Sequence, residues 1–450
     1  MKNGLPTLGG LYCHKITRAT EGRAVIISRL PSFLQCFFRP FRNQLSDDQF
    51  RHLWSFVLAL VVNLRAAKLL HLANLAPAAG HRTRHGAFCA QSHWDAPALL
   101  HDSAINLLSG MKPQAGETLY LILDDNRIAK RGRKMDHVSK IWDHKQQRFV
   151  RGHIVLTCAI CFRGVVIPWR IDLWKPKAKG GALSQGHGGA PRYRKLTDMA
   201  AQMIKDFLAP AGLKVRVLFD AFYLCPTVSK ACVSKGFFFF SVAQRGRNFT
   251  TACGGRSPSG NGKRRKIARL MPGLLRHQGK SVRMKRARGK HATLRIAAVD
   301  GHLARIGRVR MVISKRPRGP WKKTIALVTN ETGLRPRQIV AIYEMRWLIE
   351  VLFKELHQDL GLGDYQMLHR DGILRHLHLC CLAHLLLTHR CLSALGAQAI
   401  QANQQVKLPP MNQRLTALRA QIARDRIKEL LPGAKHEKLR NQLHDRLLAA

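Results

Sequence analysis

Residues 341–365 read AIYEMRWLIEVLFKELHQDLGLGDY, and the pattern predicts one amphipathic helix. Because an α-helix turns about 100° per residue, five polar side chains fall near one line along it. They are Tyr343, Arg346, Glu350, Lys354 and His357. The apolar side chains beside that line can face a core: Ile342, Leu348, Ile349, Leu352 and Phe353. Alone, such a line is typical of a solvent-facing surface with salt bridges such as Glu350 with Lys354.

The charge balance of the chain is strongly positive. Its 450 residues hold 76 Lys and Arg against 26 Asp and Glu, a net charge of +50. An excess of this size destabilises a compact state by self-repulsion unless a polyanion neutralises it. The composition therefore predicts a nucleic-acid partner. An anionic membrane is the competing partner, but no helix with a clean basic face stands out, so no membrane association is predicted.

Cysteine usage and hydropathy indicate the compartment. Cys158 and Cys161 form a CxxC inside a strand-like run, where a three-residue offset points them to opposite faces, so zinc is not predicted. The eleven cysteines show no disulfide framework, which indicates a reducing cytosol. The longest uncharged run near the N-terminus, residues 53–64, is too short to span a bilayer, and no signal peptide is recognisable. We therefore expect a cytoplasmic protein.

Residues 1–115 are predicted to be a helical N-terminal domain. Ser46 and Gln49 have the spacing of a capping box that opens the helix carrying residues 53–64, and residues 94–108 predict another helix. A small DNA-binding domain and a helical lid on the next domain are both compatible with this pattern, since no helix-turn-helix stands out.

Residues 116–395 are predicted to form a mixed α/β domain. Residues 119–123 are an apolar run of strand length that ends in Asp124-Asp125-Asn126, before a basic loop at 130–134. The pattern that follows predicts strands, helices and a Gly-rich loop: strands 149–161 and 165–173, loop 179–190, helix 193–208, strand 215–219 ending at Asp220, helix 226–235 and strand 236–242. Three antiparallel strands, then helix, strand, helix and strand are the order of an RNase H-like core.

A basic segment interrupts this domain. Residues 246–318 hold 21 Lys and Arg but one acid, Asp300, and include strand-like pieces at 293–299 and 303–314. They predict a basic β-rich insertion, with an unstructured basic linker as the alternative. A strand at 324–329, the opening helix and an apolar helix at 372–395 complete the domain, and residues 396–450 predict a helical C-terminal tail.

Acids are scarce, so their positions are informative. Asp124, Asp125 and Asp220 follow apolar strands, and Glu350 lies on the helix after the last strand. Ligands of open α/β sheets bind outside the carboxyl ends of strands, and carboxylate oxygens are what Mg²⁺ prefers. Two such ions activate water or a 3′-hydroxyl in phosphodiester displacement. Each Asp alone is better explained as a turn or capping residue. Together with Glu350, within a basic chain, they favour a metal-dependent nuclease or polynucleotidyl transferase.

Three blocks resemble bacterial DDE transposases of the insertion-sequence 4 type and the 701-like group. They are LILDDN (121–126), VRVLFDAFY (215–223) and YEMRWLIEVLFKELH (343–357). The last matches the signature Y-x2-R-x3-E-x6-K at Tyr343, Arg346 and Glu350, with His357 in place of the final lysine. In this family the first catalytic Asp usually stands directly before a Thr, and this position favours Asp125 over Asp124. Because Asn126 stands where that Thr is expected, the choice between the two stays open.

The resemblance implies chemistry and partners. Asp125, Asp220 and Glu350 would hold two Mg²⁺ ions, with Mn²⁺ able to substitute, and the freed 3′-hydroxyl of the transposon end would attack target DNA. Tyr343, Arg346, Lys354 and His357 would contact double-stranded DNA. A homodimer would join the two ends, in a bacterial cytoplasm where the protein associates with the nucleoid when bound to DNA.

Two alternatives remain at this point. One is an RNase H-like nuclease or resolvase without strand transfer. The other is a transposase copy that binds DNA but has lost catalysis, for which the departures at Asn126 and His357 are the support.

Overall fold

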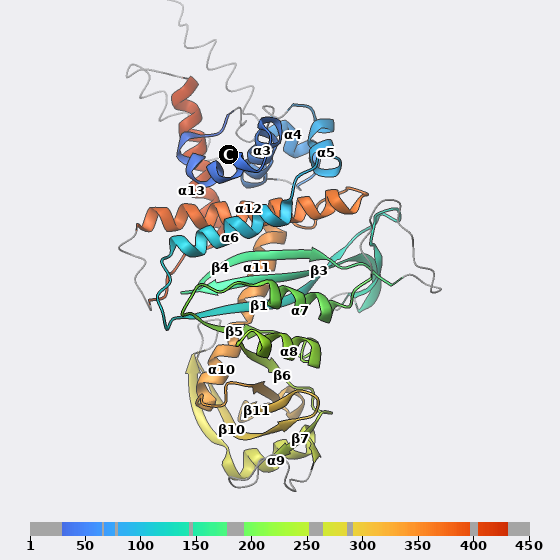
Figure 1. Cartoon of the computed structure of the whole chain (residues 1–450), viewed down its shortest axis with the longest axis vertical. Coiled ribbons are helices and arrows are strands. Elements are labelled where there is room, and N and C mark those ends of the chain that lie inside the picture. Colours follow the sequence, from blue (N-terminus) through green and yellow to red (C-terminus); the bar gives the residue numbers. More distant parts are fainter. Residues whose placement is uncertain are drawn as a thin grey trace, which may run out of the picture.

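The computed structural model describes residues 29–64, 67–76, 80–143, 147–177, 193–251, 264–285, 291–396 and 404–430. Three layers follow one another along the long axis: a helical region, a sheet with helices on its faces, and a smaller strand-rich region (Figure 1). The predicted Gly-rich loop at 179–190 and the last part of the C-terminal tail lie outside the described residues.

The helical layer begins with the described residues between 29 and 110. The Ser46 side chain accepts from the Gln49 backbone N–H at 3.3 Å, and the Gln49 side chain accepts from the Ser46 N–H at 3.0 Å, which confirms the predicted capping box. The helix it opens, α3 (Asp47–Val62), is buried along most of its length. The other elements are η1 (Ser32–Leu34), α2 (Gln35–Phe38), η2 (Arg39–Asn43), α4 (Leu69–Leu75), α5 (Arg82–Ala90) and α6 (Ala96–Gly110).

The middle layer is a mixed sheet that contains the predicted elements in order and one strand, β2, that the sequence analysis did not predict. Its strands are β1 (Thr118–Ala129), β2 (Ser139–Asp143), β3 (Arg148–Phe162), β4 (Val165–Leu173), β5 (Lys214–Leu218) and β6 (Phe238–Val242). β3 pairs antiparallel with β1, β2 and β4, whereas β1, β5 and β6 run parallel. The helices between parallel strands are α7 (Leu196–Asp206) and α8 (Pro226–Ser234). The β3–β4 hairpin turns at Arg163 and Gly164, as predicted, with φ of 47° and 83°.

Strand β1 differs from the prediction because it does not end at Asp124. It continues to Ala129, since β3 offers a ladder partner to every residue from Leu119 to Ala129. Its parallel partner is shorter: the β1–β5 ladder stops at Ile122 paired with Leu218. The two aspartates therefore lie within a strand, at the level where the neighbouring strand has ended.

The basic segment after β6 continues the same sheet. Its elements are β7 (Asn248–Thr251), β8 (Arg265–Lys266), α9 (Ile267–Gln278), β9 (Lys280–Lys285), β10 (His291–Leu303) and β11 (Gly307–Lys315), followed by η4 (Trp321–Lys323) and β12 (Ile325–Thr329). Strand order β6-β12-β11-β10 joins this region to the core, so the described part of the segment is structured. Helix α9 was not predicted from the sequence.

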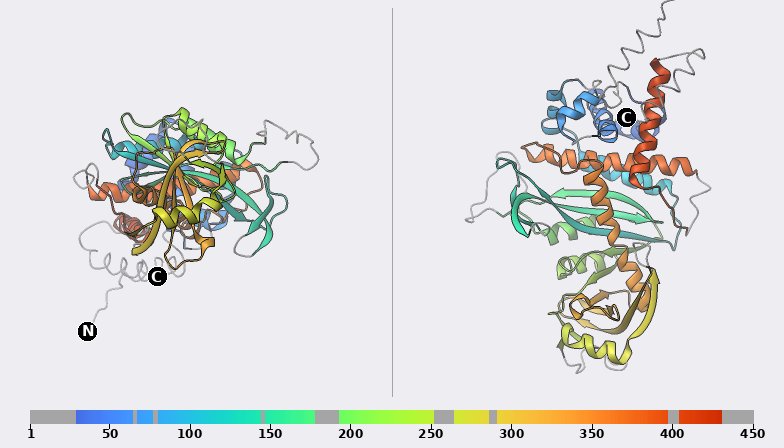
Figure 2. Two further views of the ribbon diagram at one scale, coloured as in Figure 1. Left: turned by 90° about the horizontal axis from the view of Figure 1, so that it is seen from below. Right: turned by 180° about the vertical axis from the view of Figure 1, so that it is seen from behind.

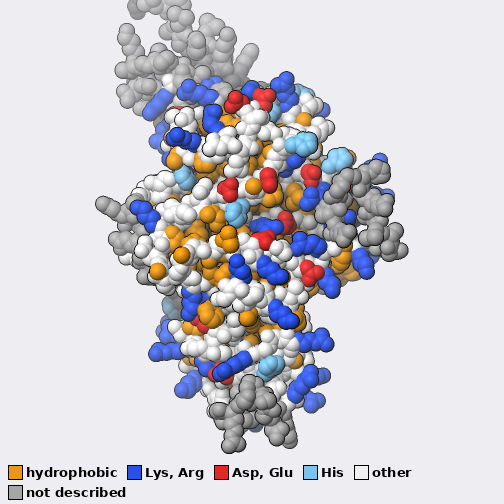
Figure 3. Space-filling view, viewed as in Figure 1, with side chains coloured by type: hydrophobic (Ala, Val, Ile, Leu, Met, Phe, Trp, Pro, Cys, Tyr) orange, Lys and Arg blue, Asp and Glu red, His pale blue; other side chains and the backbone are white. Residues whose placement is uncertain are grey.

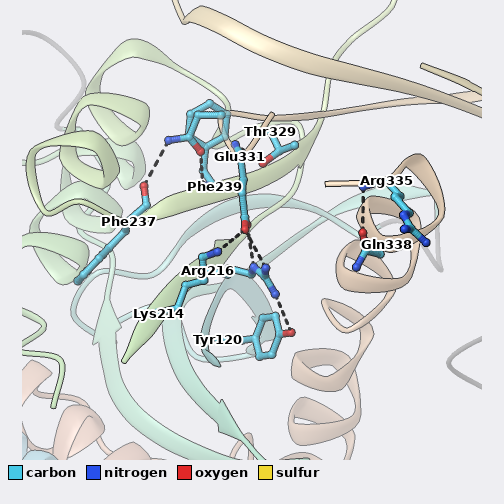
Figure 4. A network of polar contacts seen from close by, with 10 residues as sticks. Tyr120, Lys214, Arg216, Phe237, Phe239, Thr329, Glu331, Arg335 and Gln338 are labelled. Atoms are coloured by element: carbon cyan, nitrogen blue, oxygen red, sulfur yellow. Dashed lines mark hydrogen bonds and ion pairs between the residues drawn. The ribbon is translucent and has the colours of Figure 1, made fainter. Parts of the chain in front are cut away.

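A buried acid fastens this region to the core. Glu331, just after β12, accepts from Arg216 at 2.8 Å through both carboxylate oxygens, and Lys214 lies 2.7 Å away (Figure 4). Both basic residues belong to β5, at the end opposite Asp220. Arg216 also reaches the Tyr120 hydroxyl at 3.4 Å. These contacts hold the pKa of Glu331 below its ordinary value despite burial, so this cluster is a structural tie between β5 and β12.

The stretch 341–365 forms two helices and a loop, so the single predicted helix is wrong. Helix α10 (Pro336–Glu344) and helix α11 (Trp347–Gln358) are separated by Met345 and Arg346, whose N–H groups bond to carbonyls three residues earlier. The chain stays close to helical there, and the break tightens one turn. The apolar stripe is confirmed in large part: Ile342, Ile349 and Leu352 are buried in the core.

Helix α12 (Arg370–Leu395) lies between the helical layer and the sheet. By length and composition it could cross a membrane, but 72% of its apolar window is buried inside the protein, as in the core helix of a soluble fold. Helix α13 (Met411–Leu430) packs against α12 and α3. Buried Glu355 of α11 connects these helices, since it contacts His384 of α12 at 3.0 Å and Arg414 of α13 at 3.1 Å.

Candidate active site

Asp124 lies within β1, and Asp220 lies level with it, just past the end of the neighbouring strand β5. The last β1–β5 pair is Ile122 with Leu218, and each aspartate follows its member of that pair by two residues. Asp220 sits in a tight turn, where its Oδ1 accepts from the backbone N–H of Phe222 at 2.8 Å and of Tyr223 at 3.4 Å. The polar groups thus emerge where β5 stops, at the carboxyl edge of the parallel strands.

Strand alternation separates Asp124 from Asp125. Successive side chains of a strand point to opposite faces, so Asp124 and Asn126 share one face. On that face Asp124 contacts Arg346 and Asn126 contacts His357, both from the helical stretch that opened the sequence analysis. Asp125 points away from α11. It accepts from the Tyr223 hydroxyl at 2.9 Å and lies 3.9 Å from Arg127.

Arg346 joins two of the acids. Its Nη1 donates to Asp124 Oδ2, and its Nη2 donates to Glu350 Oε1 at 2.6 Å. It caps the start of α11, so Glu350 lies one helical turn further on. The planar fork suits this double contact, because guanidinium N–H groups diverge toward separate acceptors. One cation therefore sits between the first aspartate and the helix glutamate.

Burial and charge change the ionisation of this group. Burial raises the pKa of Asp124 to about 7, and the charges of Asp220 and Asp125 add to this, while Arg346 opposes it. Burial also raises the pKa of Asp125, against the hydrogen bond from Tyr223. Burial raises the pKa of Tyr343 to about 12, with contributions from Asp220 and Asp124. The charge of Asp220 thus raises the pKa of Asp124, of Asp125 and of Tyr343 alike.

The predicted DNA-contact residues of the helix have different environments. An α-helix turns about 100° per residue. Around the helix axis, Lys354 therefore points about 80° away from the direction of Arg346, whereas His357 points only about 20° away from it. Accordingly Lys354 is exposed, while His357 Nε2 lies 2.6 Å from Asn126 Nδ2 on β1. Tyr343 is partly buried against the core beside Arg346.

The carboxylates have the chemistry of a divalent-metal site. Among the described residues, however, no group of three or more His, Cys, Asp or Glu is closed around a point that could hold a metal ion. The Arg346 contacts explain this, since the guanidinium takes the place of a cation between Asp124 and Glu350. The hard oxygen donors fit Mg²⁺, provided that Arg346 moves away.

Sequence reasoning missed Tyr223 and the contact between Asn126 and His357. Tyr223 follows Asp220 by three residues, and its fully buried side chain extends from β5 back to β1. Asn126 and His357 were noted only as departures from the signature. No local pattern predicts either contact, because each joins residues far apart in the chain.

The chain that carries the site is strongly basic, with a net charge of +50. On the face drawn in Figure 3, Lys and Arg side chains are spread over the sheet layer and the strand-rich region, and acids lie mainly over the helical and sheet layers. An acidic centre within such a field can attract a polyanion and hold a cation at the same time.

A known family model matches part of the chain. Residues 193–386, less than half of the chain, match the family model of the transposase DDE domain, a segment that includes Asp220, Tyr343, Arg346 and Glu350 but begins after Asp124 and Asp125. The match supports a transposase DDE domain in this part of the chain. A search of curated proteins gave no significant match.

Proposed function

We propose that the protein is a DNA transposase of the insertion-sequence 4 type, with an RNase H-like catalytic core. It would cut transposon ends and join the freed 3′-hydroxyl to target DNA. The observation that carries the proposal is that Arg346 contacts both Asp124 and Glu350 beside Asp220, with Asp220 and Glu350 inside the segment that matches a transposase DDE domain.

The first carboxylate of the site is proposed to be Asp124. The sequence favoured Asp125 because of its position in the motif, but Asp125 lies on the strand face away from Glu350 and accepts from Tyr223. Asp124 shares a cation with Glu350 and stands level with Asp220. Asp125 then acts with Tyr223 to fix the Asp220 turn against β1.

Asp124, Asp220 and Glu350 would hold the Mg²⁺ ions, with Mn²⁺ able to substitute. Bound there, the metals would supply Lewis-acid stabilisation of charge on the attacking and leaving oxygens. The chain's own contribution is to fix the three carboxylates on one strand, the turn after its neighbour and one helix. The raised pKa of Asp124 means that a bound cation would also displace a proton from it.

Arg346 would change partners when DNA arrives. In the structure it neutralises Asp124 and Glu350. A DNA phosphate offers the same planar pair of acceptors, so the fork can turn to the backbone while a metal replaces it between the acids. Tyr343 would contribute its hydroxyl as a donor to the same backbone, and Lys354 its exposed charge. Two copies would act together, since two transposon ends must be joined.

The test is cleavage of the DNA that flanks this gene, with Mg²⁺, by the full-length protein. Asp124→Asn and Asp220→Asn are expected to abolish nicking and keep DNA binding, while Asp125→Asn keeps measurable nicking because asparagine can still accept from Tyr223. Asp47→Asn, whose side chain is 96% exposed on α3, is the matched control. If Asp125→Asn is inactive and Asp124→Asn is active, Asp125 is the first carboxylate of the site, as the sequence analysis preferred.

Two results would favour the alternative functions. Cleavage without joining of pre-nicked ends to target DNA would indicate a nuclease or resolvase. DNA binding with no cleavage under any divalent metal would indicate a copy that has lost catalysis. This control is necessary because no closed metal site is present among the described residues.

A further inference from the structure

Beyond the carboxylates, strands β1, β2 and β3 extend into a projecting arm. We define the arm as residues 127–143 and 147–151: the end of β1, the basic loop after it, β2 and the start of β3. The first five residues of β3, Arg148–Gly152, pair with β2. Figure 2 shows these teal strands reaching outward from the body of the molecule in the view from below.

One face of the arm continues the face that bears Asp124. Asp124 pairs with Thr157, so Phe149 and Arg151, eight and six residues away from Thr157 along β3, point to the same side. Their cross-strand partners on β2 are Trp142 and Lys140. Nearer the carboxylates this face is covered, since the Tyr365 ring stacks on His153. Further out it is open: Phe149 is 57% exposed.

The open face combines aromatic rings with cations. The rings of Trp142 and Phe149 lie 5.0 Å apart, and Lys140 Nζ lies 4.7 Å from the centre of the Phe149 ring. Arg151 is exposed beside them. The sequence from 127 to 151 has nine Lys and Arg against two Asp. A basic surface interleaved with exposed rings is the chemistry that holds a nucleic-acid strand: cations take phosphates and rings stack on bases.

The arm is held rigidly to the loop that follows α11. Lys130 Nζ donates to the carbonyls of Gly363 and Tyr365 at 2.6 and 2.8 Å, and its ammonium stands over the Tyr365 ring. Asp136 accepts from the backbone N–H of Arg370 at 2.9 Å, and its own N–H donates to Leu368. A surface fixed in this way loses little conformational entropy on binding.

A glycine lets the strands cross closely. At Gly152, where β1 and β2 both pair with β3, a Cβ atom would stand 2.3 Å from the carbonyl oxygen of Ile128. The arm's position relative to the carboxylates is therefore fixed by backbone packing as well as by its polar ties.

We infer that the arm binds the DNA strand that leads away from the carboxylates. Lys140 and Arg151 contact its phosphates, and Phe149 stacks on an unpaired base. At about 3.4 Å per strand residue, Arg151 and Phe149 lie roughly 20 and 27 Å along β3 from the level of Asp124. At about 3.4 Å per nucleotide this is roughly six to eight nucleotides. The choice of DNA rests on the proposed function; an RNA or an acidic protein would be a different outcome of the test.

The test measures binding by the full-length protein in EDTA, so that cleavage plays no part. Fluorescence anisotropy is recorded with a 30-nucleotide single strand, a 30-base-pair duplex and a single-stranded RNA of the same sequence, over a range of salt concentrations. Lys140→Gln and Arg151→Gln are each expected to lower the salt slope by about one on both DNA probes. Phe149→Ala is expected to weaken single-strand binding at least about fivefold, with a smaller effect on duplex.

Matched controls lie on α7, which contacts the sheet away from α11, and just after its end. Lys205→Gln and Leu208→Ala, at an exposed cation and a 74% exposed leucine, should bind within about twofold of the unmodified protein. Thermal unfolding of every variant excludes misfolding. If the arm variants bind like the controls, the arm is not a DNA surface; a larger loss with RNA than with DNA also overturns the assignment. Intact arm effects without Mg²⁺-dependent cleavage would remove the proposed function and leave the arm as a binding surface.

Discussion

Asn126 and His357, which stand 231 residues apart in the chain, are in direct contact: the amide Nδ2 lies 2.6 Å from the ring Nε2. Each of them departs from the transposase signature that the sequence resembles. The amide nitrogen is a donor, so the contact needs an unprotonated acceptor at Nε2. The two departures thus form one unit that fixes α11 against β1 beside Asp124.

This unit should behave as a coupled pair. We expect Asn126→Ala and His357→Ala each to lower the free energy of unfolding, with a coupling energy of about 1 kcal/mol in a double-mutant cycle. His357→Lys alone should also lower the free energy of unfolding, because its ammonium group, a donor, would face the Asn126 Nδ2, which is a donor too. Urea unfolding measures all three. The control cycle pairs Asn126→Ala with exposed Lys354→Ala, where additivity is expected; additivity at 357 as well would contradict the coupling.

Arg346→Ala should make the protein depend on a divalent cation for stability. Removing the guanidinium leaves Asp124 and Glu350 without their shared cation, which should cost about 2–5 kcal/mol. Mg²⁺ can then occupy the place between them and stabilise the folded state by mass action. Thermal unfolding over a Mg²⁺ titration should therefore show a larger rise in melting temperature for the variant than for the unmodified chain. Equal rises would show that Arg346 does not stand in a cation position.

The C-terminal helix should stabilise α11 through Glu355. Burial raises the pKa of this carboxyl, but the hydrogen bond and charge of His384 and the charge of Arg414 hold it below its ordinary value. Arg414→Ala removes one partner of a buried acid and should cost about 3 kcal/mol, whereas exposed Lys407→Gln should change stability by less than about 0.5 kcal/mol. Chemical unfolding of both variants checks this. A cost for Arg414→Ala no larger than the control's would show that α13 does not brace the helix.

Stability should fall on mild acidification. Burial holds the pKa of His85 and of His376 near 4, whereas both approach 6.5 in the unfolded chain. Between these values the unfolded state binds protons that the folded state does not. Stability is therefore lost as pH falls from about 6.5 to 4, by up to about 1.4 kcal/mol per pH unit for each histidine. Melting temperatures at pH 5 and 7.5 test this. His376→Gln should flatten the dependence, and exposed His277→Gln should leave it unchanged.

Local signals in the sequence predicted local structure well. The Ser46–Gln49 capping box and the Arg163-Gly164 hairpin involve residues three positions apart or fewer, so their patterns are complete in the sequence. The continuation of β1 to Ala129 depends on β3, and the face on which Asp124 lies depends on that pairing. The break at Met345 and Arg346 has no Pro or Gly to announce it. For the same reason the motif pointed to Asp125, while strand alternation, visible only with the register, favours Asp124.

The basic segment leaves the core after β6 and rejoins it at β12, and these two points lie close enough for the segment to be removed. Val242 of β6 pairs with Leu327 of β12, and the N–H of Ala243 bonds to the carbonyl of Ala326 at 2.8 Å. The exit and the return are therefore neighbours across one ladder, about 4.8 Å apart. A tight two-residue turn could bridge them. A variant in which such a turn replaces the segment between Ala243 and Ala326 would be a minimal catalytic core.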